Sequence, residues 1–139
     1  MSSHVDPLLE KSLEKCLDII APLFVDVRTH NRGMIPRELL SNNYVLGFVK
    51  GMMNVLLGRC GVIAERDRGM AILEVCARTF DCDSHTIGER LVNLHLEKDD
   101  LDYLEGINDG SDYLVGLTEG RREEVTYRLM NRLEPYIKF

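Results

Sequence analysis

The stretch Tyr44–Gly58 (YVLGFVKGMMNVLLG) decides how the rest of this chain folds. It is apolar on nearly every side, which predicts a buried central helix. Successive residues of a helix are ~100° apart, and this spacing places Gly47, Gly51, Asn54 and Gly58 in one narrow sector, with bulky side chains opposite. The central helix is therefore expected to have one flat side, which we call the glycine face.

The glycine face predicts a close contact with another helix backbone. A glycine inside a helix costs about 1 kcal/mol relative to alanine, so several on one face indicate a use. We favour another helix of the same chain over a subunit interface or a small-molecule groove. Asn54 is expected to be buried there, where its amide would orient a neighbouring helix or recognise a ligand.

The same region raises the alternative of a membrane span. The run from residue 44 to residue 64 is long enough, and Gly47 and Gly51 have the spacing of close-packed membrane helices. Lys50, Asn54 and Arg59 argue against it, because a lysine near mid-span costs about 2.5 to 3.5 kcal/mol. No membrane partner is expected.

Length and composition bound the fold and the partners. The 139 residues, 45% of them apolar, predict one domain over residues 1–139. The helical patterns along the chain predict that this domain is all-α, with five or six helices around the central one. A net charge of -6 and the absence of tryptophan disfavour nucleic acid. The first residues show no basic region followed by an apolar run, so a cytoplasmic protein is expected, with its four irregularly spaced cysteines reduced.

Prolines and glycines predict where helices begin and end. A first helix should start near Pro7, and Pro22 should kink it or begin a second piece. Gly61 is suited to a left-handed stop after the central helix. A last helix is expected from near Thr118 or Glu119 to a point before Pro135.

Residues 81–85 (DCDSH) form the densest group of potential metal ligands in the sequence. Cys82, His85 and Glu89 could bind Zn²⁺, but a zinc site needs a further convergent ligand and no second cluster appears. We favour a helix start in which an aspartate or serine of the same segment caps the backbone amides. No cofactor is expected.

An approximate duplication follows, with LDYLEGINDG at 101–110 and SDYLVGLTEG at 111–120. Its four glycines predict two short helical turns rather than one continuous helix. Residues 97–119 are strongly acidic, but no register fits the calcium loop of an EF-hand, so an unstructured acidic surface is expected. Arginines of the last helix should pair with this acidic strip, within the chain rather than across a dimer.

The leading functional hypothesis is a non-enzymatic cytoplasmic interaction protein, such as an adaptor, chaperone or regulatory subunit. It is expected to be a homodimer and to use the glycine face or the acidic strip. The hypothesis rests on the lack of a recognisable nucleophile motif or phosphate-binding glycine loop. The alternative is a small-molecule-binding or metal-binding helical domain, enzymes included, with Asn54, Cys82, His85 and Glu89 as candidates. These residues match no family motif.

Overall fold

A computed structural model describes residues 7–97, 99–116 and 118–137, and confirms the all-α prediction. Within these ranges the chain forms six helices of at least 13 residues and the short helix α2. In order, the elements are α1 (Pro7–Ile20), the 3₁₀ segment η1 (Ala21–Phe24), α2 (Val25–His30), the 3₁₀ segment η2 (Arg37–Ser41), α3 (Asn43–Arg59), α4 (Glu65–Thr79), α5 (Ser84–Leu96), α6 (Leu101–Val115) and α7 (Glu119–Ile137).

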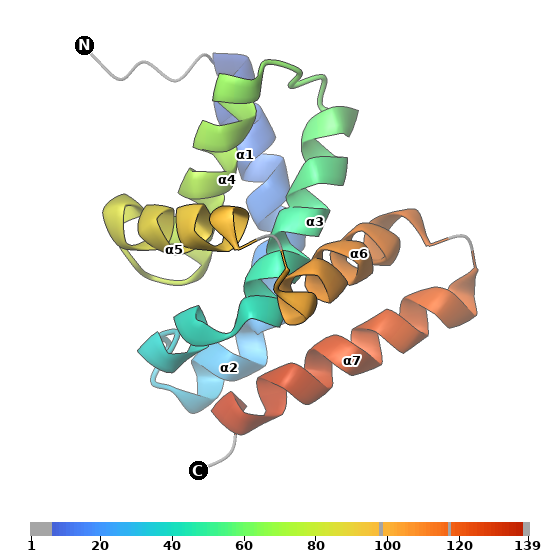
Figure 1. Cartoon of the computed structure of the whole chain (residues 1–139). Coiled ribbons are helices and arrows are strands. Elements are labelled where there is room, and N and C mark those ends of the chain that lie inside the picture. Colours follow the sequence, from blue (N-terminus) through green and yellow to red (C-terminus); the bar gives the residue numbers. More distant parts are fainter. Residues whose placement is uncertain (1–6, 98, 117, 138–139) are drawn as a thin grey trace.

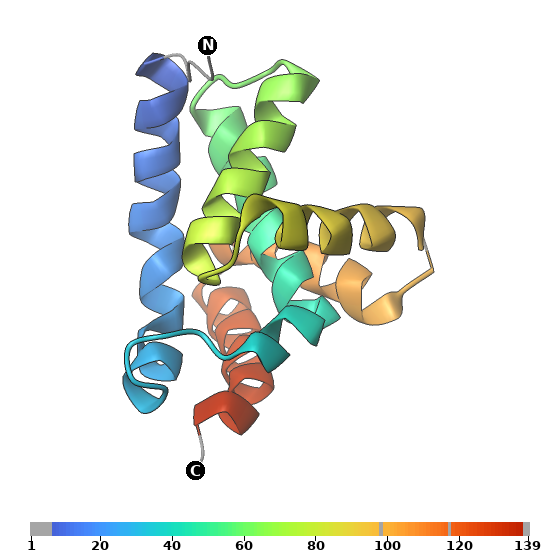
Figure 2. The ribbon, with the colours of Figure 1, turned by 90° about the vertical axis from the view of Figure 1, so that its left-hand side faces the viewer.

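Helix α3 lies at the centre, as its sequence predicts. It packs against α1 and α4 on one side and against α6 and α7 on the other (Figure 1). Helices α6 and α7 form an antiparallel pair, whereas α5 crosses below α4 and projects away from α1 (Figure 2). Most of α3 is buried, because apolar side chains occupy nearly every side of it. Among the helices described, none is both long enough and apolar enough to cross a membrane.

The glycine face of α3 meets α6 backbone to backbone. A methyl group on Gly47 or Gly51 would lie less than 3.0 Å from a carbonyl oxygen of α6, that of Tyr103 or Ile107 respectively. Real Cβ atoms essentially never approach that closely. The helix that covers these two glycines therefore belongs to the same chain, which is the arrangement favoured above.

Helix α6 contributes glycines of its own to the same contact. Gly106 and Gly110 face the carbonyl oxygens of Tyr44 and Phe48, again at distances that exclude a side chain. Both helices thus carry two glycines four residues apart, and each pair fits against the partner backbone. The contacts advance along both helices together, so α3 and α6 run in the same direction where they cross.

The prediction of two short turns in the duplicated segment is wrong. The described part of the segment is one continuous helix from Leu101 to Val115, with Gly106 and Gly110 inside it. The local cost of the two glycines is about 1 kcal/mol each, and it is offset because only glycine permits this contact with α3. The acidic strip is accordingly largely helical, not unstructured.

The other helix boundaries agree with the predictions from prolines and glycines, with one exception. Pro22 lies in η1, which separates α1 from α2, and Gly61 has the expected positive φ of 76° after α3. The last helix was expected to end before Pro135, but α7 continues through it to Ile137. Proline cannot donate the backbone hydrogen bond of its position, but only two residues of α7 follow Pro135, so a bend there displaces little of the helix.

We predict opposite effects for alanine at two glycines of the same helix. Gly51→Ala should lower the free energy of unfolding by about 2 kcal/mol or more, because the new methyl group overlaps the Ile107 carbonyl. A methyl group on Gly58 meets nothing within 4 Å, so Gly58→Ala should leave stability unchanged or raise it by up to about 1 kcal/mol. Urea unfolding followed by circular dichroism measures both values. Equal effects would contradict the backbone contact described here.

Candidate functional site

The far end of the glycine face does not have the expected environment. Asn54 and Gly58 are both exposed, so the prediction of a buried Asn54 is wrong. The close backbone contact with α6 includes Gly51 but not Gly58, where an added methyl group would meet no atom within 4 Å. The backbone oxygen of Asn54 accepts a hydrogen bond from Arg68 at 3.0 Å, but its side chain faces no buried partner that would need orienting.

The segment 81–89 forms a helix start. The Asp83 side chain accepts a hydrogen bond from the Thr86 backbone N–H at 2.7 Å and caps α5. This bond lowers the pKa of the Asp83 carboxyl. His85 and Glu89 pair with each other at 2.9 Å on the exposed side of α5. No three histidine, cysteine or acidic side chains converge within the described ranges, so Cys82, His85 and Glu89 do not form a ready metal site.

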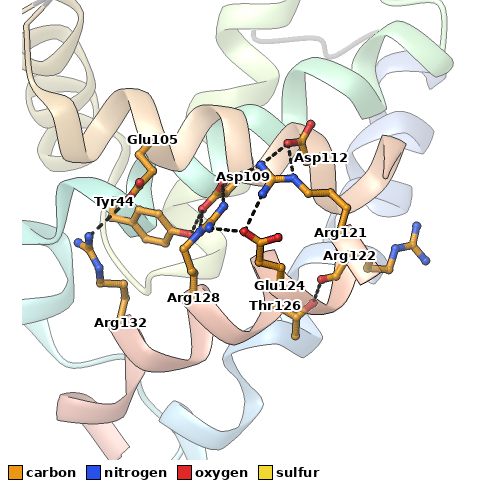
Figure 3. A network of polar contacts seen from close by, with 10 residues as sticks. All are labelled: Tyr44, Glu105, Asp109, Asp112, Arg121, Arg122, Glu124, Thr126, Arg128 and Arg132. Carbon is orange, nitrogen blue, oxygen red and sulfur yellow. Dashed lines mark hydrogen bonds and ion pairs between the residues drawn. The ribbon is translucent and has the colours of Figure 1, made fainter. Parts of the chain in front are cut away.

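A polar network that the sequence only partly predicted lies between α6 and α7 (Figure 3). At its centre is Asp109, whose side chain is buried. Asp109 accepts hydrogen bonds from the Tyr44 hydroxyl at 2.5 Å and from two guanidinium nitrogens of Arg128 at 2.7 and 2.8 Å. Arg121 lies 3.5 Å from the same carboxylate and also pairs with Asp112 at 2.6 Å. The predicted pairing of acidic-strip carboxylates with α7 arginines inside the chain is thus observed.

The surroundings of Asp109 determine its charge. Burial alone would raise its pKa, but the hydrogen bonds from Arg128 and Tyr44 and the charges of Arg128 and Arg121 outweigh that effect. The pKa of Asp109 is therefore lowered, and the carboxylate is ionised at neutral pH. Burial first, and the hydrogen bond to Asp109 second, raise the pKa of Tyr44.

This network connects helices and does not resemble a catalytic centre. Tyr44 is fully buried, its ring lies under the Arg132 guanidinium at 4.5 Å, and its hydroxyl is already bonded to Asp109. A general base needs access to the proton that it removes, and Asp109 lacks such access. The geometry instead holds α3, α6 and α7 together through one buried carboxylate.

A different region exposes large apolar side chains. It lies where α5 ends and α6 begins, at the projecting end of the molecule (Figure 2). Val92, Leu96 and Leu101 are 57%, 70% and 79% exposed, and Leu104 is exposed as well. We call these four residues the corner surface. The sequence did not predict this surface, because helical spacing shows which residues share a face but not which face a neighbouring helix leaves uncovered.

Acidic residues border the corner surface. Leu96 shares a shallow depression with Glu97, Asp99 and Asp100, all in the connection between α5 and α6. Asp100 is engaged, since it caps α6 and accepts a hydrogen bond from Asn43. Glu97 and Asp99 are exposed. The surface thus combines apolar contact area with negative charge.

Comparison with known proteins adds no further constraint on the function. No protein-family model, curated protein or solved structure matches this chain.

We predict that the Asp109 network makes the fold sensitive to acid. The pKa of an aspartate in the unfolded chain is about 3.9, and the pKa of Asp109 in the folded protein is lower. The ionised carboxylate therefore stabilises the fold above about pH 3.9, and this contribution is lost as the pH falls through the folded-state pKa of Asp109. Asp109→Asn should cost about 2 to 3 kcal/mol at pH 7, and the difference from the wild type should shrink towards pH 3. Unfolding in urea between about pH 3 and pH 7 measures this.

Asp112→Asn is the matched control. Asp112 also pairs with Arg121, but it is partly exposed, so its loss should cost less than about 1 kcal/mol at any pH. A loss in Asp109→Asn that stays constant with pH would show that its charge is not what stabilises the fold.

Proposed function

We propose that this chain is a non-enzymatic interaction protein of the cytoplasm, and that its corner surface binds an apolar, basic segment of another protein. The observation that carries the proposal is the shared exposure of Val92, Leu96, Leu101 and Leu104. Scattered exposed apolar side chains are normal, whereas a group of them with a polar rim is typical of interaction sites. The reducing cytoplasm suits the four cysteines, all of which carry free thiols.

Charge indicates the kind of partner. Glu97 and Asp99 lie between the apolar residues of α5 and those of α6. In the sequence of this connection the acidic residues outnumber the single lysine, Lys98, so they would attract lysine or arginine side chains. An amphipathic helix with apolar residues on one side and basic residues beside them offers the complementary pattern. The partner we propose is therefore a protein segment of that type.

The homodimer expected from the sequence has less support than this heterotypic contact. The two surfaces that suggested it are used within the chain, because Gly47 and Gly51 lie against α6 and the carboxylates of α6 pair with α7. A symmetric dimer through the corner surface would bring Glu97 and Asp99 of both copies together. Like charges in such a contact oppose association.

The first test uses two synthetic amphipathic peptides of about four helical turns, one of leucine and lysine and one of leucine and glutamate. Fluorescence anisotropy of each labelled peptide should show saturable binding of the Leu/Lys peptide and about tenfold weaker binding of the Leu/Glu peptide. The double variant Leu96→Ser, Leu101→Ser should weaken the Leu/Lys complex at least about tenfold.

Ile63→Ser is the control for that variant. Ile63 is 86% exposed but lies in the connection between α3 and α4, outside the corner surface. It should therefore leave peptide affinity unchanged. Equal binding of the two peptides, or equal loss in both variants, would overturn the proposal.

Native mass spectrometry tests the choice of occupant. We expect a monomer, because like charges oppose a dimer at the corner surface. A wild-type dimer that Leu96→Ser with Leu101→Ser converts to a monomer would show that a second copy occupies the surface. That result would overturn the heterotypic proposal.

A further inference from the structure

A second concave feature lies between α3, α4 and α5. It is a cavity of about 210 Å³ formed by residues of all three helices. Its lining consists of Lys50 from α3, Gly69 and Ile72 from α4, and Leu91, Val92 and His95 from α5. We call it the Lys50 groove. Its walls are mainly apolar, and within the described ranges the lining side chains that can carry charge are the basic Lys50 and His95.

Lys50 is the unusual member of this lining. It is half-buried, and in the described part of the chain it has neither a hydrogen bond nor an ion pair. A lysine in such a place can lay its aliphatic stem along the apolar walls and keep its ammonium group at the open edge, where the group is free to pair with an anion. Among the residues that the structure describes, no aspartate or glutamate lines the groove, although the chain as a whole has a net charge of -6. An anionic group is therefore what this site lacks.

The groove is also unfilled on its α4 side. A methyl group on Gly69 would meet no atom within 4 Å, so no neighbouring side chain occupies that space. Val92 and His95 are exposed, which leaves the groove open to solvent at the α5 side. The volume is smaller than the 300 to 1,000 Å³ of pockets that hold drug-sized molecules, so a suitable ligand is small.

We propose that the Lys50 groove binds a small amphipathic carboxylate, such as a short-chain or medium-chain fatty acid. Its carboxylate would pair with Lys50, and its apolar part would pack against Ile72, Leu91 and Val92. A charge-assisted hydrogen bond to an ammonium group, in a mainly apolar surround, favours the anion over a neutral molecule of equal size. The proposal does not depend on the protein partner at the corner surface, although Val92 borders both features.

The test compares three probes of equal chain length, namely sodium octanoate, 1-octanol and octylammonium chloride. Titrations followed in ¹H–¹³C spectra of the methyl groups should show saturable shifts at Ile72, Leu91 and Val92. Octanoate should bind at least about tenfold more tightly than octanol, and octylammonium more weakly than both. Binding of all three with equal affinity would overturn the proposal, since it would show an apolar patch without anion selectivity.

Substitutions of Lys50 then test its role. Lys50→Met keeps most of the length of the side chain and removes the charge, so octanoate should lose its preference over octanol. Lys50→Arg should retain that preference. Lys11→Met is the matched control, because Lys11 is exposed on α1 and should have no effect. If Lys50 merely extends its amine into solvent, Lys50→Met would leave the preference unchanged, which would refute the assignment.

A steric variant provides an independent test. Gly69→Leu should fill the groove and weaken octanoate binding at least about tenfold. Gly58→Leu places the same side chain at another open helical glycine and should leave binding unchanged. Circular dichroism checks that both variants remain folded.

Two further outcomes separate this site from the corner surface. The double variant Leu96→Ser, Leu101→Ser should bind octanoate with the affinity of the wild type, whether or not that variant has lost peptide binding. If the Leu/Glu peptide instead produces the methyl shifts and octanoate does not, the groove recognises an acidic protein segment. The small-carboxylate proposal would then be wrong.

Discussion

The contact between the backbones of α3 and α6 is the constraint on which the rest of the structure depends. Gly47 and Gly51 on one helix, and Gly106 and Gly110 on the other, remove the side chains that would hold the axes apart. At such short range the glycine Cα–H groups can also contact carbonyl oxygens, a weak but repeated attraction. The crossing that results brings Asp109, next to Gly110, within reach of Tyr44 on α3 and Arg128 on α7.

This constraint also determines what the surface can offer to partners. Much of the acidity of α6 is directed at α7, where Arg121, Arg128 and Arg132 neutralise it. Helix α5 is outside that arrangement and makes its main contact with α4. Two features therefore gather around α5: exposed apolar residues at its end, and beside it Lys50, which has no ion pair within the described part of the chain.

Sequence patterns predicted the parts of this fold that depend on local chemistry. The apolar run around Gly47 indicated the central helix, and the acid-to-arginine pairing followed from charge. The interpretation of Gly106 and Gly110 was wrong because helix propensity counts a local cost, whereas their benefit comes from α3. The sequence did hold one signal for this contact, because both helices carry two glycines four residues apart. The angular position of a residue around α3 also does not show how far along the helix the contact with α6 extends, so the prediction for Asn54 was wrong. Nothing in the sequence indicated a groove at Lys50, which only argued against a membrane span.

The glycines of α6 have a consequence for the order in which the chain folds. Isolated helices of this length are marginal in water, and two internal glycines make α6 poorer still. Its helical state must therefore form largely as it docks on α3, across a separation that includes all of α4 and α5. Contacts so distant in sequence close slowly. During synthesis, α3 thus emerges before the segment that covers it, and its bare glycine face remains open until residues near Gly110 have left the ribosome.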